Sequence, residues 1–405
     1  DRWHNMRSTL TPAFTGSKLR MMFELMKECA ENLTNYFLKQ DGTITVEVKD
    51  IFSRFANDVI GTAAFGITCN SFEDKENEFY LMGQELSKIF TSIKHIKFLF
   101  YMKMPMIMEI LKIPVFPKSV STFFRGIIKD TLKVRRERGI IRPDMIHLLM
   151  EAKQGRLEYV ESKKLENSGF AVVEEYTKLK NLQSKEKPIL TDEDIVAQAL
   201  VFFSAGFETV SVTLTFATYE LAVNWEVQQK LSKEVDDVLK EYNGQLSYEN
   251  VIKMKYLDMV VTETLRKWPP IGNTDRLSSR PFIIEPKLPG EKPVLLESET
   301  SVRIPIFDIH RDEKYYPDPE KFDPERFSDE NKHNINPFTY LPFGVGPRNC
   351  IGSRFALLEG KLMIAQIISK FEIIPVTETE IPIQAYHSGF TLKPKKGVWV
   401  GLKPR

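Results

Sequence analysis

Residues 342–352 read Pro342-Phe343-Gly344-Val345-Gly346-Pro347-Arg348-Asn349-Cys350-Ile351-Gly352, and this stretch decides how the sequence is interpreted. It runs directly into a segment whose apolar residues recur at helical spacing on one face: Phe355, Leu358, Leu362 and Ala365. Cys350 therefore stands at the start of a predicted helix. Backbone amides and the positive end of the helix dipole favour a thiolate at such a position, which suits a nucleophile or a metal ligand.

The surroundings of Cys350 narrow these possibilities. Glycines on both sides let a flat ligand approach the backbone closely, and no second metal-binding side chain lies nearby in the sequence. A metal site with a single thiolate ligand of this kind predicts haem. A lone buried cysteine in a turn is the alternative, and it is the interpretation of Cys29 and Cys69.

The composition excludes several classes of protein. Of the 405 residues, 42% are hydrophobic and 27% are charged, which is typical of a folded globular protein and not of a disordered or fibrous one. The formal net charge of +1 gives no overall attraction to nucleic acid, so no nucleic-acid partner is expected. Three cysteines form neither a disulfide framework nor paired zinc sites, and they fit a reducing compartment.

The first half of the chain is predicted to be rich in α-helix. Thr191 and Asp194 have the spacing of a capping box and mark the start of a long apolar helix. The apolar run from Ile195 to Val223 is long enough to cross a membrane, but Glu208 near its middle would cost about 2.5–3.5 kcal/mol there. We therefore predict a helix buried inside a large protein.

Shorter elements follow this helix. Two amphipathic helices are expected around residues 227–239 and 257–268, the second ending before Pro269-Pro270. Residues 294–296 and 302–306 have the composition of short strands.

Two other segments have unusual compositions. Residues 98–116 are apolar, rich in methionine and interrupted by proline, which predicts either short helices at a lip or irregular core packing. Residues 151–187 are rich in Lys and Glu, which predicts a mobile surface insertion or, alternatively, a solvated face.

The pattern Phe343-x-x-Gly346-x-Arg348-x-Cys350-x-Gly352 resembles the haem-binding signature of the cytochrome P-450 superfamily. Four further stretches resemble motifs of that family in the expected order: Trp3-x-x-x-Arg7, Ala205-Gly206-Phe207-Glu208-Thr209, Glu263-Thr264-Leu265-Arg266 and Pro324-Glu325-Arg326-Phe327. The resemblance covers essentially the whole chain and is strongest to insect microsomal members that metabolise xenobiotics. It implies a mostly α (α+β) fold with small antiparallel sheets, as one catalytic domain over residues 1–405. The resemblance begins at the third named helix of the family, so the membrane anchor, the first sheet and the first helices are expected to be missing.

The resemblance also implies a cofactor site for haem b. Cys350 would be its axial thiolate ligand, and Thr274-Asp275-Arg276 contributes a cation for which a plain surface arginine is the alternative. The two haem propionates need charged or donor partners, expected from Trp3, Arg7, Arg276 and Arg348. The rest of the cofactor site is expected from Ala205, Gly206, Phe343, Gly346 and Gly352. His310 is expected to be structural, because Cys350 already supplies the ligand.

Catalytic roles are implied for the central helix. Gly206 would leave room for oxygen, Thr209 would stabilise bound dioxygen and its protonation, and Glu208 would help to supply protons. Without the resemblance, Gly206 and Thr209 would indicate close packing and a hydroxyl bonded back to a carbonyl. Substrate contacts are implied for Val201, Ser204, Ala205, Ile271, Asn273 and Phe390, although ordinary core packing explains each of them as well.

Glu263 and Arg266 lie three residues apart on one helix face beside an apolar stripe. With Arg326 they are expected to form a partly buried structural network. The alternative is a surface ion pair worth about 0–1 kcal/mol.

The implied function is that of a monooxygenase that inserts one atom of O₂ into a lipophilic molecule. Electrons would come from NADPH through an NADPH–cytochrome reductase, which would dock on a basic face formed by Lys18, Arg20, Arg354 and Lys361. The intact protein is expected at the cytoplasmic face of the endoplasmic reticulum membrane. A haem-thiolate isomerase or synthase and an inactive truncated fragment are the alternatives.

Overall fold

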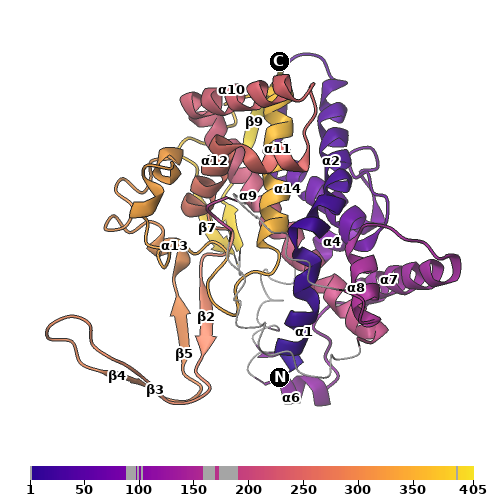
Figure 1. The fold of residues 1–405 in the computed structure, drawn as a ribbon, viewed down its shortest axis with the longest axis vertical. Helices are drawn as coiled ribbons and strands as arrows, with labels where there is room; N and C mark the ends of the chain where they lie inside the picture. The colour runs from indigo at the N-terminus through magenta and orange to yellow at the C-terminus, as the bar shows by residue number, and fades with distance from the viewer. Residues whose placement is uncertain are drawn as a thin grey trace.

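Helix α9 (Asp192–Val223) runs through the middle of the molecule and organises the fold (Figure 1). The predicted capping box is present, because the Thr191 hydroxyl accepts the Asp194 backbone N–H and the Asp194 carboxylate accepts the Thr191 backbone N–H. Most residues from Val210 to Ala222 are buried, which confirms the prediction of a buried helix. The structure is a computed structural model that describes residues 2–87, 97, 100–101, 104–157, 169–172, 190–388 and 391–405.

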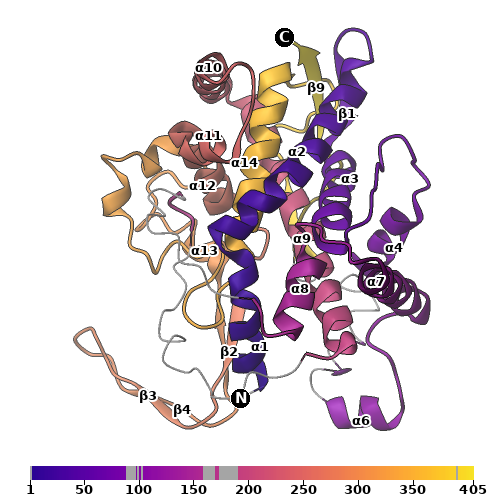
Figure 2. The ribbon, with the colours of Figure 1, turned by 45° about the vertical axis from the view of Figure 1, so that its right-hand side comes forward.

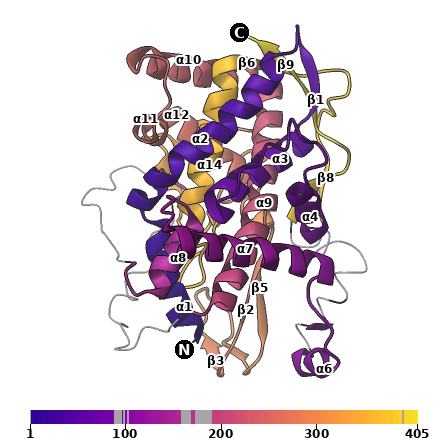
Figure 3. The ribbon, with the colours of Figure 1, turned by 90° about the vertical axis from the view of Figure 1, so that its right-hand side faces the viewer.

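The other helices surround α9 in layers, as Figures 2 and 3 show. Before α9 come α1 (Arg2–Leu10), α2 (Gly16–Leu38), α3 (Val48–Ile60), α4 (Glu78–Ser87), α6 (Pro105–Ile110), α7 (Lys118–Arg138) and α8 (Met145–Lys153). After it come α10 (Trp225–Glu241), α11 (Tyr248–Lys253), α12 (Lys255–Lys267), α13 (Ile306–Ile309) and α14 (Ser353–Lys370). Short helical turns are formed by η1 (Thr11–Phe14), η2 (Gly61–Phe65), η5 (Pro324–Phe327) and η6 (Lys332–Asn334). The two predicted amphipathic helices correspond to α10 and α12, and α12 ends just before Trp268-Pro269-Pro270.

All strands pair in small antiparallel sheets. One sheet has the order β1 (Ile44–Glu47), β9 (Trp399–Pro404) and β6 (Phe371–Ile374). Three pairs are formed by β2 (Thr274–Leu277) with β5 (Ser301–Ile304), β3 (Phe282–Ile284) with β4 (Val294–Leu296), and β7 (Ala385–Ser388) with β8 (Thr391–Pro394). The mostly α fold with small antiparallel sheets is therefore confirmed.

Three local expectations change. Strand β1 lies in the helical first half and pairs with residues near the C-terminus, a partner that the local sequence does not reveal. The strand expected over 302–306 ends at Ile304, because Pro305 has no N–H for the ladder and α13 begins at Ile306.

The two segments of unusual composition are described only in part. In the methionine-rich stretch, α6 is a short helix with strongly exposed apolar residues, which agrees with short helices and not with core packing. Of the expected insertion over 151–187, the structure describes residues 151–157 and 169–172.

Candidate functional site

A cavity of about 840 Å³ lies between the cavity-facing side of α9 and the loop that carries Cys350. Twelve of the predicted site residues line it: Val201, Ser204, Ala205, Gly206, Glu208, Thr209, Ile271, Arg276, Phe343, Arg348, Cys350 and Gly352. Trp3, Arg7, Asn273 and Gly346 do not line it, and Phe390 lies outside the described residues. The walls are mainly apolar, so the site suits a flat or lipophilic ligand with few polar groups.

The loop before α14 is closed by its own backbone hydrogen bonds. The Cys350 N–H donates to the Phe343 carbonyl at 2.9 Å, and the Asn349 N–H donates to the Gly346 carbonyl at 3.0 Å. Gly344 and Gly346 have φ values of +69° and +79°, a backbone conformation that favours glycine. Gly346 thus serves the turn that presents Cys350 and does not contact a ligand in the cavity.

Cys350 is open to the cavity but lies deep within the protein. Burial raises the pKa of the Cys350 thiol, while the backbone N–H of Gly352 and the charge of Arg7 lower it by less. The helix start alone therefore does not ionise the thiol, contrary to the sequence-based expectation. A bound metal cation would deprotonate a coordinating thiol outright.

Two predicted propionate ligands instead contact the cysteine loop or its arginine. Arg7 donates from Nη1 to the Asn349 carbonyl at 2.8 Å and from Nη2 to the Asn349 side chain, next to Cys350. The Arg348 guanidinium carbon lies 3.5 Å from the centroid of the Trp3 ring. Arg276 and Arg348 supply the cationic part of the cavity wall, and Arg7 and Trp3 support that wall from behind.

On α9, the Thr209 hydroxyl donates to the Ala205 carbonyl at 2.6 Å. A Cβ at Gly206 would lie 2.9 Å from Cδ1 of Ile60 on α3, so Ile60 fills the space beside this glycine. This geometry favours the close-packing interpretation of Gly206 over room for oxygen.

Replacing Gly206 by alanine should therefore destabilise the fold, because the new methyl group overlaps Ile60. Overpacking of this kind costs about 1–3 kcal/mol. Urea unfolding measures this cost, and the double variant Gly206→Ala/Ile60→Val, which removes the overlapping Cδ1, should recover most of it. A stability equal to that of the unaltered chain would show that Ile60 rearranges freely.

Glu208 lies between two lysines that the sequence analysis did not identify. Its carboxylate oxygens lie 3.3 Å from Lys49 Nζ on α3 and 3.8 Å from Lys393 Nζ on β8. Lys49 Nζ also lies 2.9 Å from the Ser211 hydroxyl and 3.0 Å from the Ser53 hydroxyl. Burial lowers the pKa of Lys49, and the charge of Glu208 opposes this shift. Both lysines are distant in the sequence, so no local pattern marks them.

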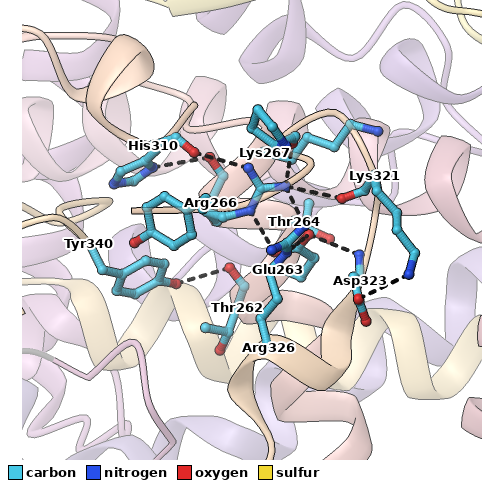
Figure 4. Close-up of polar contacts among 12 residues, drawn as sticks. Thr262, Glu263, Thr264, Arg266, Lys267, His310, Lys321, Asp323, Arg326 and Tyr340 are labelled. Atoms are coloured by element: carbon cyan, nitrogen blue, oxygen red, sulfur yellow. Dashed lines mark hydrogen bonds and ion pairs between the residues drawn. The ribbon is translucent and has the colours of Figure 1, made fainter. Parts of the chain in front are cut away.

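Glu263 and Arg266 form a fully buried, bidentate ion pair (Figure 4). The two hydrogen bonds measure 2.7 and 2.8 Å, and Arg326 Nε lies 3.6 Å from Glu263. Glu263 also accepts the Asp323 N–H at 2.9 Å, and Arg266 donates to the carbonyls of His310 and Pro319. The predicted structural network of these three charged residues is confirmed.

His310 connects this network to the cysteine loop. Its Nε2 accepts the Leu341 N–H at 2.7 Å, so Nδ1 must carry the proton that it donates to the Arg266 carbonyl at 3.0 Å. Burial lowers the pKa of His310 to about 3, which keeps the ring neutral. His310 is therefore structural, as predicted.

The predicted basic docking face needs one correction. Lys361 is only 1% exposed and pairs with Asp258 at 2.7 Å, so it cannot meet a partner. Its charge is buried because Asp258 on α12 provides a close partner. Arg20 is exposed and pairs with Glu249, and Lys18 and Arg354 are half-buried.

A mostly α fold in which one cysteine faces a long central helix across an apolar cavity defines the class of haem-thiolate enzymes. The cytochrome P450 family model matches residues 1–400. Cytochrome P450 9e2 of Blattella germanica is 44% identical over 420 residues, which cover 100% of this chain and 75% of that relative. Probable cytochrome P450 9f2 of Drosophila melanogaster is 42% identical over 408 residues (100% and 74% covered), and cytochrome P450 6k1 of Blattella germanica is 35% identical over 398 residues (98% and 73% covered). The chain belongs to the cytochrome P450 family and is a P450 monooxygenase.

Family membership implies haem with a cysteine thiolate ligand, a redox partner, O₂ and a lipophilic substrate in general terms. Within the described ranges, α9 is the one helix long and apolar enough to cross a membrane. It lies in the centre of the molecule and packs against α3, α12 and α14, so its apolar length is explained by the protein core and the cavity.

Proposed function

We propose that this chain inserts one oxygen atom of O₂ into a lipophilic small molecule, xenobiotic or endogenous, and reduces the other atom to water with electrons from NADPH. The observation that carries the proposal is that Cys350 and Thr209 line opposite parts of the same mainly apolar cavity. We also propose that residues 1–405 act as a single catalytic domain.

The residues around the cavity fit haem b. Cys350 would be the axial thiolate ligand, and Arg276 and Arg348 would pair with the propionates. Arg7 and Trp3 would keep Cys350 and Arg348 in place through the contacts described above. When bound, the haem supplies the iron centre at which dioxygen is activated. In the described part of the chain no cluster of three His, Cys, Asp or Glu side chains could hold a metal ion alone, which agrees with a prosthetic group held by one protein ligand.

The chain's own catalytic groups would be Thr209 and Glu208. The Thr209 hydroxyl donates its proton to the Ala205 carbonyl, so its oxygen remains able to accept a hydrogen bond at the cavity wall. Glu208 lines the same wall and would exchange protons with water there, with Lys49 and Lys393 holding its carboxylate in place.

The apolar walls support a lipophilic substrate. Val201 and Ile271 would contact it, and the Ser204 hydroxyl, which has no hydrogen-bond partner, would take a polar group of the substrate. Asn273 and Phe390 stay predictions from the family resemblance. The electron donor would be NADPH–cytochrome reductase, acting on the side of Cys350 away from α9, and the intact protein would reside at the endoplasmic reticulum membrane.

The test is turnover of the haem-supplemented chain with NADPH, a cytochrome P450 reductase and a panel of lipophilic compounds under oxygen-18-labelled dioxygen. A product that carries one labelled oxygen atom and requires both NADPH and reductase supports the proposal. Rearrangement of a hydroperoxide without NADPH would instead indicate an isomerase or synthase. A haem-loaded chain that converts none of the compounds and consumes no NADPH would indicate an inactive fragment.

Replacing Glu208 by glutamine should lower kcat on the order of 10²-fold, the usual scale of a lost acid–base group. It should also leave Lys49 buried without its carboxylate, so the pKa of Lys49 falls further below its ordinary value of 10.5. Because the unfolded chain then binds more protons than the folded one, stability should rise with pH between the lowered pKa and 10.5.

Urea unfolding over this pH range and kcat measure the two effects. Glu193→Gln is the matched control, since Glu193 is an exposed acid on the same helix that pairs with Arg125 and Lys129. An equal loss of kcat in both variants would contradict a specific role of Glu208.

A further inference from the structure

Residues 169–172, Gly169-Phe170-Ala171-Val172, lie in the connection between α8 and α9 and are packed against the helical core. We call them the 169–172 clip. Ala171 is buried, and Val172 shares a small hollow with Arg354, Leu357 and Lys361 at the start of α14. The clip is thus a described anchor within a long connection.

One side of the clip covers the buried ion pair of Asp258 and Lys361. The Phe170 N–H donates to Asp258 Oδ2 at 3.0 Å, while Asp258 Oδ1 lies 2.7 Å from Lys361 Nζ. Gly169 has φ +101°, and a Cβ there would lie 2.1 Å from Asp258 Oδ1. Both the backbone conformation and this close approach require glycine, so the clip has one specific placement.

The other side of the clip is an aromatic contact. The Phe170 ring lies 5.3 Å from the Tyr340 ring and 5.0 Å from the Phe327 ring, measured between centroids. Tyr340 is held in turn by its hydroxyl, which donates to the Thr262 carbonyl at 3.0 Å, and by the stacked ring of His310. His310 accepts the N–H of Leu341, the residue after Tyr340.

These contacts hold both chain segments that flank the haem ligand. Tyr340 precedes Cys350 by ten residues and Lys361 follows it by eleven. We propose that Phe170 is a positioning residue for Cys350: the clip braces the entry into the cysteine loop through Tyr340 and the exit through Lys361. The role in haem ligation rests on the proposed function, whereas the bracing of the loop stands on these contacts alone.

The test compares Phe170→Ala with Phe338→Ala in the full-length 405-residue chain. Phe338 is a matched control, because it precedes Tyr340 by two residues but is 69% exposed. The first readout is hydrogen–deuterium exchange of the Leu341 and Cys350 amides, both of which donate hydrogen bonds in the loop. The loss of two aromatic pairs should speed their exchange on the order of tenfold in Phe170→Ala and not in Phe338→Ala. Phe170→Tyr should restore slow exchange.

The second readout is the rate at which the haem-loaded chain loses its thiolate-type Soret band in the carbon monoxide complex. This rate should rise in Phe170→Ala alone. Exchange that is unchanged at both amides, or that rises equally throughout the protein, would overturn the proposal. If the unaltered chain shows no thiolate band, the haem-thiolate function fails, and the exchange readout still decides whether the clip braces the loop.

Discussion

Replacing Cys350 by serine is expected to abolish the red-shifted Soret band of the reduced carbon monoxide complex and all NADPH-dependent turnover. A serine hydroxyl is almost never ionised near neutral pH and cannot replace a thiolate as a soft metal ligand. The loop itself should persist, because the Cys350 backbone N–H that donates to Phe343 is unchanged by the substitution. The variant therefore removes the ligand and keeps its surroundings.

Cys69→Ser is the control for this experiment. Cys69 is buried away from the cavity, and burial raises the pKa of its thiol to about 12, so it cannot act as a thiolate. This variant should keep the red-shifted band. A band that survives in Cys350→Ser would contradict the ligand assignment, and a band lost in both variants together with the circular dichroism of the fold would point to unfolding.

The features that could be predicted from the sequence are those set by local spacing. The capping box at Thr191 and Asp194 fixes the start of α9, because both partners lie within one helical turn. The spacing of Glu263 and Arg266 beside an apolar stripe places a buried ion pair correctly, since helix geometry puts residues three apart on one face.

The features that could not be predicted depend on partners distant in the sequence. Lys49 and Lys393 reach Glu208 from α3 and β8, and no local pattern marks either lysine as its partner. The role of Gly206 is set by Ile60 on another helix, and Lys361 is buried because Asp258 lies opposite. In each case the local sequence gives the chemical type of the residue, and the tertiary fold decides whether it meets the cavity, the core or solvent.

Glycine at Gly346 illustrates the same limit within a motif. The sequence pattern places it near a flat ligand, whereas its φ of +79° and its position outside the cavity wall assign it to the turn. The residues that do meet the cavity from this loop are Phe343, Arg348, Cys350 and Gly352. A signature can thus combine residues that contact the ligand with residues that only shape the loop.

Replacing Arg266 by alanine is expected to have the largest effect on stability. Breaking a buried ion pair by removing one partner costs about 3–5 kcal/mol, because the other charge stays buried and uncompensated. Here Glu263 keeps the Asp323 N–H and the more distant Arg326, while the carbonyls of His310 and Pro319 lose their donor. Urea unfolding measures the loss, and haem retention should fall with it because His310 also holds the Leu341 N–H.

Two variants separate charge, geometry and burial in this network. Arg266→Lys keeps a positive charge but cannot form the two parallel hydrogen bonds to Glu263, so it should recover only part of the stability. Lys233→Ala breaks an exposed pair with Asp237 and should cost less than about 1 kcal/mol. An Arg266→Ala variant no less stable than Lys233→Ala would contradict a structural role of the network. If Glu263→Leu/Arg266→Met is more stable than Arg266→Ala alone, the cost in the single variant comes from the stranded carboxylate, since an apolar pair leaves no charge unpaired.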